Sequence, residues 1–147
     1  MKKLALSLFG AALALSAATT VQAQDQWTTQ VRKLLDKAGE VVEGRGYKQS
    51  HEPSTGSLAK GDNESLTIEL EKGTQYAMIG VCDNDCSDID MKAFDPDGNE
   101  VASDTKDDDV PVLIFDAPQT GKYRVKVMMI KCQTNPCRYG VGTWSKD

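Results

Sequence analysis

The chain has 147 residues, of which 39% are hydrophobic and 27% are charged, and its 17 Lys and Arg against 22 Asp and Glu give a net charge of −5 at pH 7. This negative balance argues against binding to nucleic acid or to anionic membrane, because affinity for both comes from Lys and Arg contacts with phosphate groups. It favours simple solubility, a cationic partner or a divalent metal. The length is sufficient for one domain with its own hydrophobic core.

The first 23 residues have the pattern of a signal peptide. Lys2 and Lys3 precede an apolar stretch from residue 4 to residue 15, and Val21-Gln22-Ala23 forms a small-x-small cleavage site. The apolar stretch is shorter than the ~20 residues that a membrane-spanning helix needs. We therefore predict a periplasmic or secreted protein without membrane insertion of the mature form. Cleavage before Gln24 would leave 15 basic and 22 acidic residues, a net charge of −7.

Residues 24–46 are predicted to form an N-terminal amphipathic helix, because apolar side chains recur at three- and four-residue steps and charged ones occupy the opposite face. Gly44 or Gly46 would end this helix. The pattern covers too few heptads for a coiled coil, which favours packing on the helix's own domain over docking to a partner. The predicted apolar positions are Trp27, Val31, Leu34, Leu35, Ala38, Val41 and Val42.

Residues 47–55 are predicted to be a polar connector, and residues 56–147 a β-sandwich of about seven or eight short strands. In the second segment, alternating or continuous apolar runs recur at roughly ten-residue intervals, as in sandwiches and barrels. The run 110–115 contains Pro111, which cannot donate a backbone hydrogen bond, so we place this run at a sheet edge or at the start of a strand. The runs are 65–70, 75–82, 89–93, 110–115, 123–129 and 139–141. Turn residues separate them at Glu71-Lys72-Gly73, Asp95-Pro96-Asp97-Gly98-Asn99 and Gln119-Thr120-Gly121.

The four cysteines, Cys82, Cys86, Cys132 and Cys137, form two close pairs. In an exported protein such a set predicts two disulfides, for which three pairings exist that sequence alone cannot distinguish. We favour the local pairs 82–86 and 132–137, since each flanks a turn-like stretch. A zinc site is the alternative, but the spacings are unusual for one and thiolates outside the cytoplasm are normally oxidised.

Three stretches of this chain carry a resemblance to a known family. They are Gly56-Ser57-Leu58 with the strand 66–73, the acidic strand and turn 88–98, and Phe115-Asp116-Ala117-Pro118 with the strand 121–127. Together they resemble the bacterial pre-peptidase C-terminal domain, a jelly-roll-like antiparallel β-sandwich found attached to many secreted peptidases. The resemblance implies an exported non-catalytic module that binds protein, polysaccharide or calcium. Unlike the family, this chain has two cysteine pairs and no preceding peptidase domain.

Acidic residues gather in the predicted loops, and Asp83, Asp85, Asp88 and Asp90 are the candidate calcium ligands. Calcium takes six to eight oxygen ligands, and a divalent cation would relieve the repulsion between such carboxylates. The helix-loop-helix calcium pattern fails, because a loop beginning at Asp95 has Glu100 where Gly is required. The alternative is that these aspartates serve turn geometry and solubility.

No set of residues amounts to a catalytic site, and we predict that the protein is not an enzyme. His51 is the only histidine, and it lies in the predicted polar connector beside Glu52 and Pro53, where a solvated role is favoured over that of a catalytic base. No glycine-rich phosphate loop or nucleotide-binding pattern occurs. Trp144 and Tyr47 are the candidate anchors of a binding surface, because exposed aromatic side chains bind sugars and proteins.

The leading hypothesis is therefore an exported non-catalytic binding or accessory module. The alternatives are a calcium-stabilised structural domain, and a small enzyme or enzyme inhibitor that uses the acidic loops.

Overall fold

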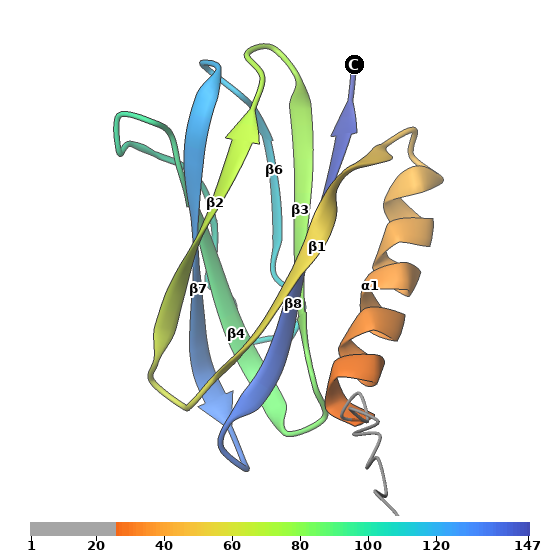
Figure 1. Ribbon diagram of the computed structural model, residues 1–147, viewed down its shortest axis with the longest axis vertical. Coiled ribbons are helices and arrows are strands. Elements are labelled where there is room, and N and C mark those ends of the chain that lie inside the picture. The colour runs from red at the N-terminus through yellow and green to blue at the C-terminus, as the bar shows by residue number, and fades with distance from the viewer. Residues whose placement is uncertain (1–25) are drawn as a thin grey trace, which may run out of the picture.

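The computed structural model describes residues 26–147, and the predicted signal peptide lies outside these described residues. Eight strands of this part form two four-stranded antiparallel sheets, with one helix beside them (Figure 1). Sheet A has the order β1-β8-β3-β6 and sheet B the order β2-β7-β4-β5, which is an eight-stranded jelly roll. The elements are α1 (Gln26–Glu43), β1 (Lys48–Leu58), β2 (Asn63–Leu70), β3 (Gln75–Cys82), β4 (Cys86–Phe94), β5 (Glu100–Asp104), β6 (Val112–Asp116), β7 (Gly121–Cys132) and β8 (Cys137–Lys146).

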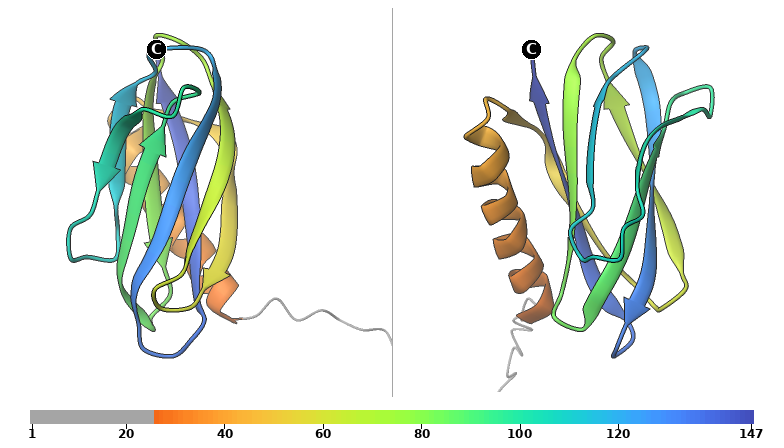
Figure 2. Two further views of the ribbon diagram at one scale, coloured as in Figure 1. Left: turned by 90° about the vertical axis from the view of Figure 1, so that its left-hand side faces the viewer. Right: turned by 180° about the vertical axis from the view of Figure 1, so that it is seen from behind.

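The predicted fold class is confirmed, and the burial pattern shows why the sequence adopts it. In β7, Tyr123, Val125, Val127 and Met129 point into the space between the sheets, and polar residues alternate with them. β3 does not alternate because both of its faces are covered. Its inner side chains face sheet B, while Ala77, Ile79 and Val81 pack with α1. Figure 2 shows the helix on the outer side of sheet A. Within the described residues, no helix is long and apolar enough to cross a membrane.

The predicted helix is also confirmed, and it packs on the outer face of sheet A over β8 and β3. Val31, Leu35 and Val42 are buried there together with Trp144 of β8. Val41, which we predicted on this face, is 59% exposed. The helix ends in a Schellman motif, in which Gly46 has a φ of 90° and the N–H of Tyr47 donates to the carbonyl of Val42 at 3.2 Å.

Two strands were not predicted. The expected connector at 47–55 is wrong, because most of it belongs to β1, an edge strand of sheet A. The ladder between β1 and β8 is irregular between Gln49 and His51 and between His51 and Ser54, so the period of two is interrupted. β5, the second of these strands, is short and only partly buried.

The prediction for Pro111 is confirmed, since it immediately precedes β6 at the other edge of sheet A.

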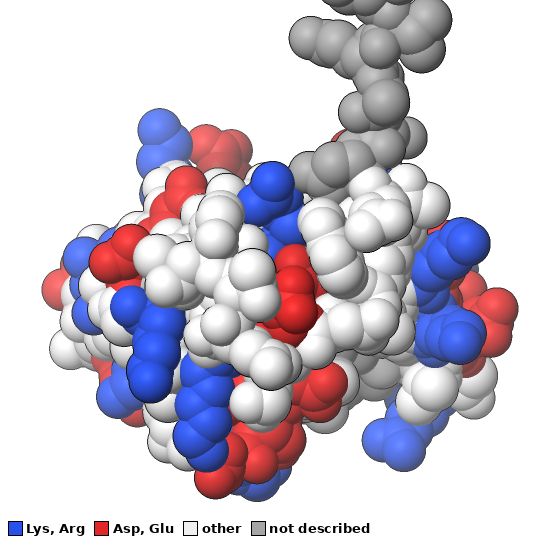
Figure 3. Space-filling view, turned by 90° about the horizontal axis from the view of Figure 1, so that it is seen from below, with Lys and Arg blue, Asp and Glu red and all other residues white. Residues whose placement is uncertain are grey.

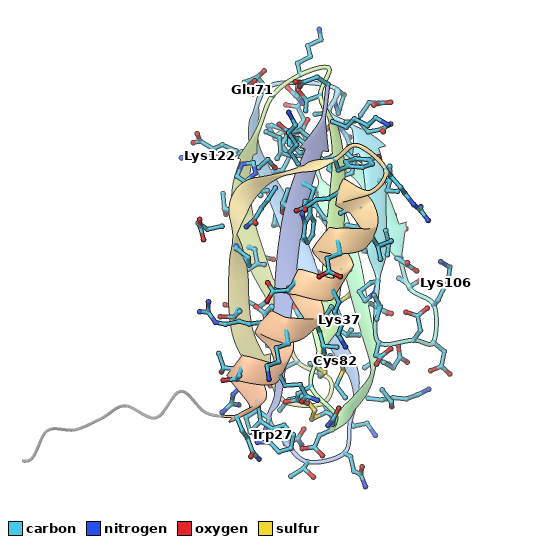
Figure 4. All side chains as sticks on the ribbon, turned by 90° about the vertical axis from the view of Figure 1, so that its right-hand side faces the viewer. Trp27, Lys37, Glu71, Cys82, Lys106 and Lys122 are labelled. Atoms are coloured by element: carbon cyan, nitrogen blue, oxygen red, sulfur yellow. A yellow bond between two sulfur atoms is a disulfide. The ribbon has the colours of Figure 1, made fainter. Side chains whose placement is uncertain are left out.

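The two predicted disulfides, Cys82–Cys86 and Cys132–Cys137, are confirmed. Each closes a tight turn at the lower end of the molecule, where Figure 4 labels Cys82. The two bridges are neighbours, because Cys86 lies opposite Cys132 in the β4–β7 ladder. Seen from this end, acidic and basic side chains are interspersed around uncharged surface (Figure 3).

We expect Gly140→Ala to destabilise the domain by roughly 1–3 kcal/mol, because the added methyl group overpacks the helix–sheet contact. A Cβ atom at Gly140 would lie 2.7 Å from Cγ1 of Val31 and 2.8 Å from Cδ1 of Leu35. The thermal midpoint of the mature protein should fall. Gly44→Ala, at an exposed position after the helix, should change stability by less than about 0.5 kcal/mol. Equal midpoints for the two variants would contradict this account of the helix contact.

Candidate binding groove between the two sheets

β1 and β2 are the edge strands of the two sheets on the same side of the sandwich, and they run apart from the turn that joins them (Figures 1 and 2). A groove with a cavity of about 240 Å³ opens between them. We call it the β1–β2 groove. Its apolar floor consists of Leu66, Ile68, Val125 and Val141, and its polar rim of His51, Glu52, Ser54, Thr67, Glu69 and Thr143.

The groove is open because β1 presents polar side chains to the core. Residues directly opposite each other in an antiparallel ladder point to the same face of the sheet. Ser54 lies opposite Val141, and His51 lies opposite Thr143, so both face the interior. Neither fills the space that an aliphatic side chain would occupy. Further down the strand, Leu58 is buried in the core and the sandwich closes.

Two hydrogen bonds between the sheets frame the groove. The Tyr139 hydroxyl donates to a carboxylate oxygen of Glu64 at 2.6 Å. Burial raises the pKa of Tyr139 above its ordinary value, and the Glu64 carboxylate raises it further, so the phenol stays protonated as the donor. At the other end, Nε2 of His51 lies 3.0 Å from the carbonyl oxygen of Glu69. A carbonyl only accepts, so Nε2 carries the proton.

The remaining nitrogen of His51 is also engaged. Its Nδ1 lies 2.9 Å from Oγ of Ser50, and the carbonyl of Thr143 lies 3.3 Å from the same hydroxyl, so these two acceptors share one hydroxyl proton. The imidazole is thus held by β1, β2 and β8 together. This role was not predicted from the sequence, where His51 had the pattern of a solvated residue.

Two charged residues line the β1–β2 groove, but Glu69 alternates with the inward Leu66, Ile68 and Leu70, so its carboxylate lies toward the outer face of sheet B. The other is Glu52, and no Lys or Arg of the described residues lines the groove. Four ion pairs form among residues 26–147, and none involves either glutamate. The nearest cation in the ladder is Lys122, the register partner of Glu69, which Figure 4 labels beside Glu71 at the upper edge.

The four predicted calcium ligands do not converge. Asp83 is buried, and its carboxylate accepts hydrogen bonds from the backbone N–H groups of Asp85 at 3.2 Å and Arg138 at 2.7 Å. It therefore fixes the turn that the Cys82–Cys86 bridge closes. Across the described part of the chain, no three His, Cys, Asp or Glu residues form a group that could hold a metal ion. Calcium binding at Asp83, Asp85, Asp88 and Asp90 remains a prediction without a preformed site.

Asp88 and Asp90 lie in unfavourable surroundings for a negative charge. Asp88 is buried, its Oδ1 has no hydrogen-bond partner, and its Oδ2 lies 3.6 Å from Nζ of Lys131. Burial raises the pKa of Asp88, and the charge of Asp107 raises it further. Burial likewise raises the pKa of Asp90, together with the charges of Asp88 and Asp104. Both ionised carboxylates therefore cost stability at neutral pH.

The pKa values of Asp95 and Asp104 shift in the opposite direction, because both carboxylates accept hydrogen bonds from backbone N–H groups. Burial disfavours their ionised forms, but hydrogen bonds outweigh it and lower both pKa values. Asp95 accepts from the N–H groups of Asp97 and Asn99 in the β4–β5 turn. Asp104 accepts from the N–H of Val112 at the start of β6. The alternative interpretation, in which aspartates of the loops serve turn geometry, thus applies to Asp95 and Asp104.

The predicted aromatic binding surface is wrong. Trp144 is only 3% exposed and lies under α1, and Tyr47 is 7% exposed and donates from its hydroxyl to Oε1 of Gln75 at 2.7 Å. Both belong to the core between helix and sheet. Trp144 fits there because Gly39 of α1 lacks a side chain, and a Cβ atom at that position would lie 3.1 Å from the indole.

The fold and the groove together define a jelly-roll domain with one open edge. No protein-family model matches the chain, and no curated protein sequence does. Among solved structures, the chain is similar to PliG, a periplasmic lysozyme inhibitor of g-type lysozyme from Aeromonas hydrophila. The two share 14% sequence identity with a TM-score of 0.49, over 69% of this chain and 90% of that one. The likeness concerns the fold alone, and the resemblance to the pre-peptidase C-terminal domain stays a prediction.

We expect Asp88→Asn to raise the thermal midpoint at pH 7, because it removes a buried charge whose pKa is raised in the folded state. The cost of that charge is present above the folded pKa and disappears as pH falls below the unfolded value near 3.8. The advantage of the variant should therefore shrink as the melt is repeated toward pH 3.5. Asp109→Asn, an equal charge change at an exposed residue, is the control. A lower midpoint for Asp88→Asn at pH 7 would mean that the Lys131 ion pair outweighs burial.

Proposed function

We propose that the mature protein is an exported, non-catalytic module that binds another protein through the β1–β2 groove. The observation that carries this proposal is the open groove itself, with an apolar floor and a polar rim, in a sandwich that is closed further along the same strands. Binding sites commonly combine an apolar surface with a few polar groups that fix orientation.

Export is supported by two independent features. Residues 1–23 have the charge, hydropathy and cleavage pattern of a signal peptide. All four cysteines of the chain are paired in disulfides, which persist in oxidising compartments such as the periplasm or the medium. A protein that stayed in the cytoplasm would need neither a signal peptide nor disulfides.

The non-catalytic part of the proposal is supported by the state of the most reactive side chains. His51 is the only histidine of the chain, and both ring nitrogens are engaged by Ser50 and by the Glu69 carbonyl. The Ser50 hydroxyl is a nucleophile in contact with Nδ1, but the other ring nitrogen bonds a backbone carbonyl, and among the described residues no carboxylate orients the imidazole as in a catalytic triad. The cysteines are held in disulfides and offer no thiolate.

A protein ligand is favoured over a polysaccharide by the position of the aromatic residues. Sugar sites use exposed aromatic rings as platforms, whereas Tyr76, Tyr123 and Tyr139 are buried in the core, as are Tyr47 and Trp144. Of the aromatic residues, His51 alone lines the β1–β2 groove. A module of this kind acts either as an accessory subunit or as an inhibitor of an exported enzyme, and the identity of its partner decides between these roles.

We expect Ser54→Trp to abolish capture of the partner, because the indole fills the groove from its β1 side. The measurement is affinity capture from the exported protein fraction of the source cells, with immobilised mature protein and mass spectrometry. Ser65→Trp is the matched control, since Ser65 belongs to β2 but does not line the groove. A partner retained equally by Ser54→Trp and Ser65→Trp would place the binding site elsewhere. If the unmodified protein captures no specific partner, the proposed protein-binding function is contradicted.

A further inference from the structure

We propose that the β1–β2 groove binds an extended strand of the partner protein, which pairs with the free edge of β2. The inference rests on the function proposed above and names the form in which the partner enters the groove. β2 is an edge strand of sheet B, and no strand of the described residues pairs with its second side. A strand added at such an edge gains main-chain hydrogen bonds and directs every second side chain toward the groove.

The hydrogen bonds at the two ends of β2 show which of its backbone groups face the free edge. Just before the strand, the carbonyl of Asp62 accepts from the N–H of Met129 in β7 at 3.0 Å. Because every second residue of an antiparallel ladder bonds to the same neighbour, the even-numbered residues of β2 bond to β7. The odd-numbered residues point the other way. The carbonyl of Glu69 agrees with this alternation, since its partner is His51 of β1.

The backbone of Thr67 is therefore open toward the groove. Thr67 lines the groove, although its side chain alternates with the inward side chains of Leu66 and Ile68. Its N–H and C=O groups are what border the cavity, because they point away from β7 at the free edge. The N–H and C=O of Ser65 point in the same direction one repeat earlier. The apolar floor thus lies beside a row of backbone donors and acceptors that no strand pairs.

This row selects an extended strand as the occupant. A helix satisfies its backbone groups within itself and could not pair with Thr67. β1 on the opposite side of the groove is a poor template, because its ladder has two register shifts and it contains Pro53. β2 pairs with β7 without interruption from Asn63 to Leu70, so its free groups are evenly spaced. The bond from His51 to the Glu69 carbonyl marks the end of the free row.

The floor determines the side chains that the incoming strand carries. Residues opposite each other in a ladder point to the same face, so those opposite Leu66 and Ile68 enter the cavity of about 240 Å³. They meet aliphatic side chains, including Val125 and Val141, and a polar residue there would lose its water contacts without compensation. The residue opposite Thr67 faces solvent and must keep its N–H. The expected segment therefore alternates apolar and polar residues and has no proline at that position.

The first measurement is amide hydrogen exchange of the mature protein by NMR. The N–H groups of Ser65 and Thr67 should exchange fast in the free protein, and those of Leu66 and Ile68 slowly, because only the latter bond to β7. The probe is a short blocked peptide in which threonine alternates with valine between terminal lysines. Its binding should protect the Thr67 amide and shift the methyl groups of Leu66 and Ile68. Absence of both effects at millimolar peptide would overturn the inference.

Two N-methylated forms of this peptide test the pairing itself, since they have the same side chains and charge. The central threonine would lie opposite Thr67 with its N–H directed at β2, whereas the valine N–H groups would point away. Methylation of the central threonine nitrogen should weaken binding by at least about fivefold, as expected for a lost hydrogen bond, and methylation of a neighbouring valine nitrogen by less than about twofold. Equal losses, or a larger loss with methylated valine, would overturn the inference.

Thr67→Pro should abolish peptide binding, because it removes the free N–H and its ring blocks the edge, whereas the bonds to β7 are kept. Thr67→Ala is the matched control, since it changes the outward side chain and keeps the N–H. If Thr67→Pro does not fold, the methylated peptides still decide. Peptide binding that survives in folded Thr67→Pro would overturn the inference. So would protection of the Thr67 amide that rises with protein concentration without peptide, because a second copy would then occupy the edge.

These results separate the inference from the proposed function. If a protein partner is captured and lost on Ser54→Trp, but retained by Thr67→Pro, the groove remains the binding site and strand pairing is wrong. If the peptide pairs with β2 and no protein partner is captured, strand addition at this edge is supported and the protein-binding role fails.

Discussion

The packing of α1 on the outer face of sheet A is the contact on which the rest of the domain depends. It buries the second face of β3 and β8, so the domain has a helix–sheet core in addition to the core between the sheets. Close approach requires glycines on β8, where Gly140 faces Val31 and Leu35 and Gly142 faces the ring of Trp144. Because this second core adds buried apolar surface, the inter-sheet core does not have to be sealed along every edge.

The open edge follows from what β1 lacks. As an edge strand it contributes few aliphatic side chains, and its inward positions His51 and Ser54 leave the floor of the groove accessible. The opening is stable because polar bonds, and not apolar contacts, span it from sheet to sheet. β1 also resists unwanted pairing with other chains, because its ladder is irregular and it contains Pro53. An exposed edge can thus present a binding surface without the usual risk of strand-to-strand association.

The sequence predicts those elements whose periodicity is complete. α1 and β7 show clear periods of 3.6 and 2, the turn at 95–99 has the required residues, and both disulfides join near neighbours. β1 has no usable period, because it is exposed on both faces and irregularly paired. The groove could not be predicted, since its walls are brought together only by the pairing of β1 with β8 and β2 with β7. For Trp144 a signal existed: Gly140 and Gly142 alternate before it, and glycines in a strand mark a close approach.

The two disulfides lie at one end of the sandwich, and β1 and β2 separate toward the other end (Figure 1). The turn between β1 and β2 lies at the end that the disulfides close, so these two strands are joined there. β1 is paired with β8 along its length, and the bond from His51 to the Glu69 carbonyl spans the gap, so motion that widens the gap would break hydrogen bonds. The width of the groove is accordingly set by hydrogen bonds, whereas the opposite end of the domain is closed by covalent bridges.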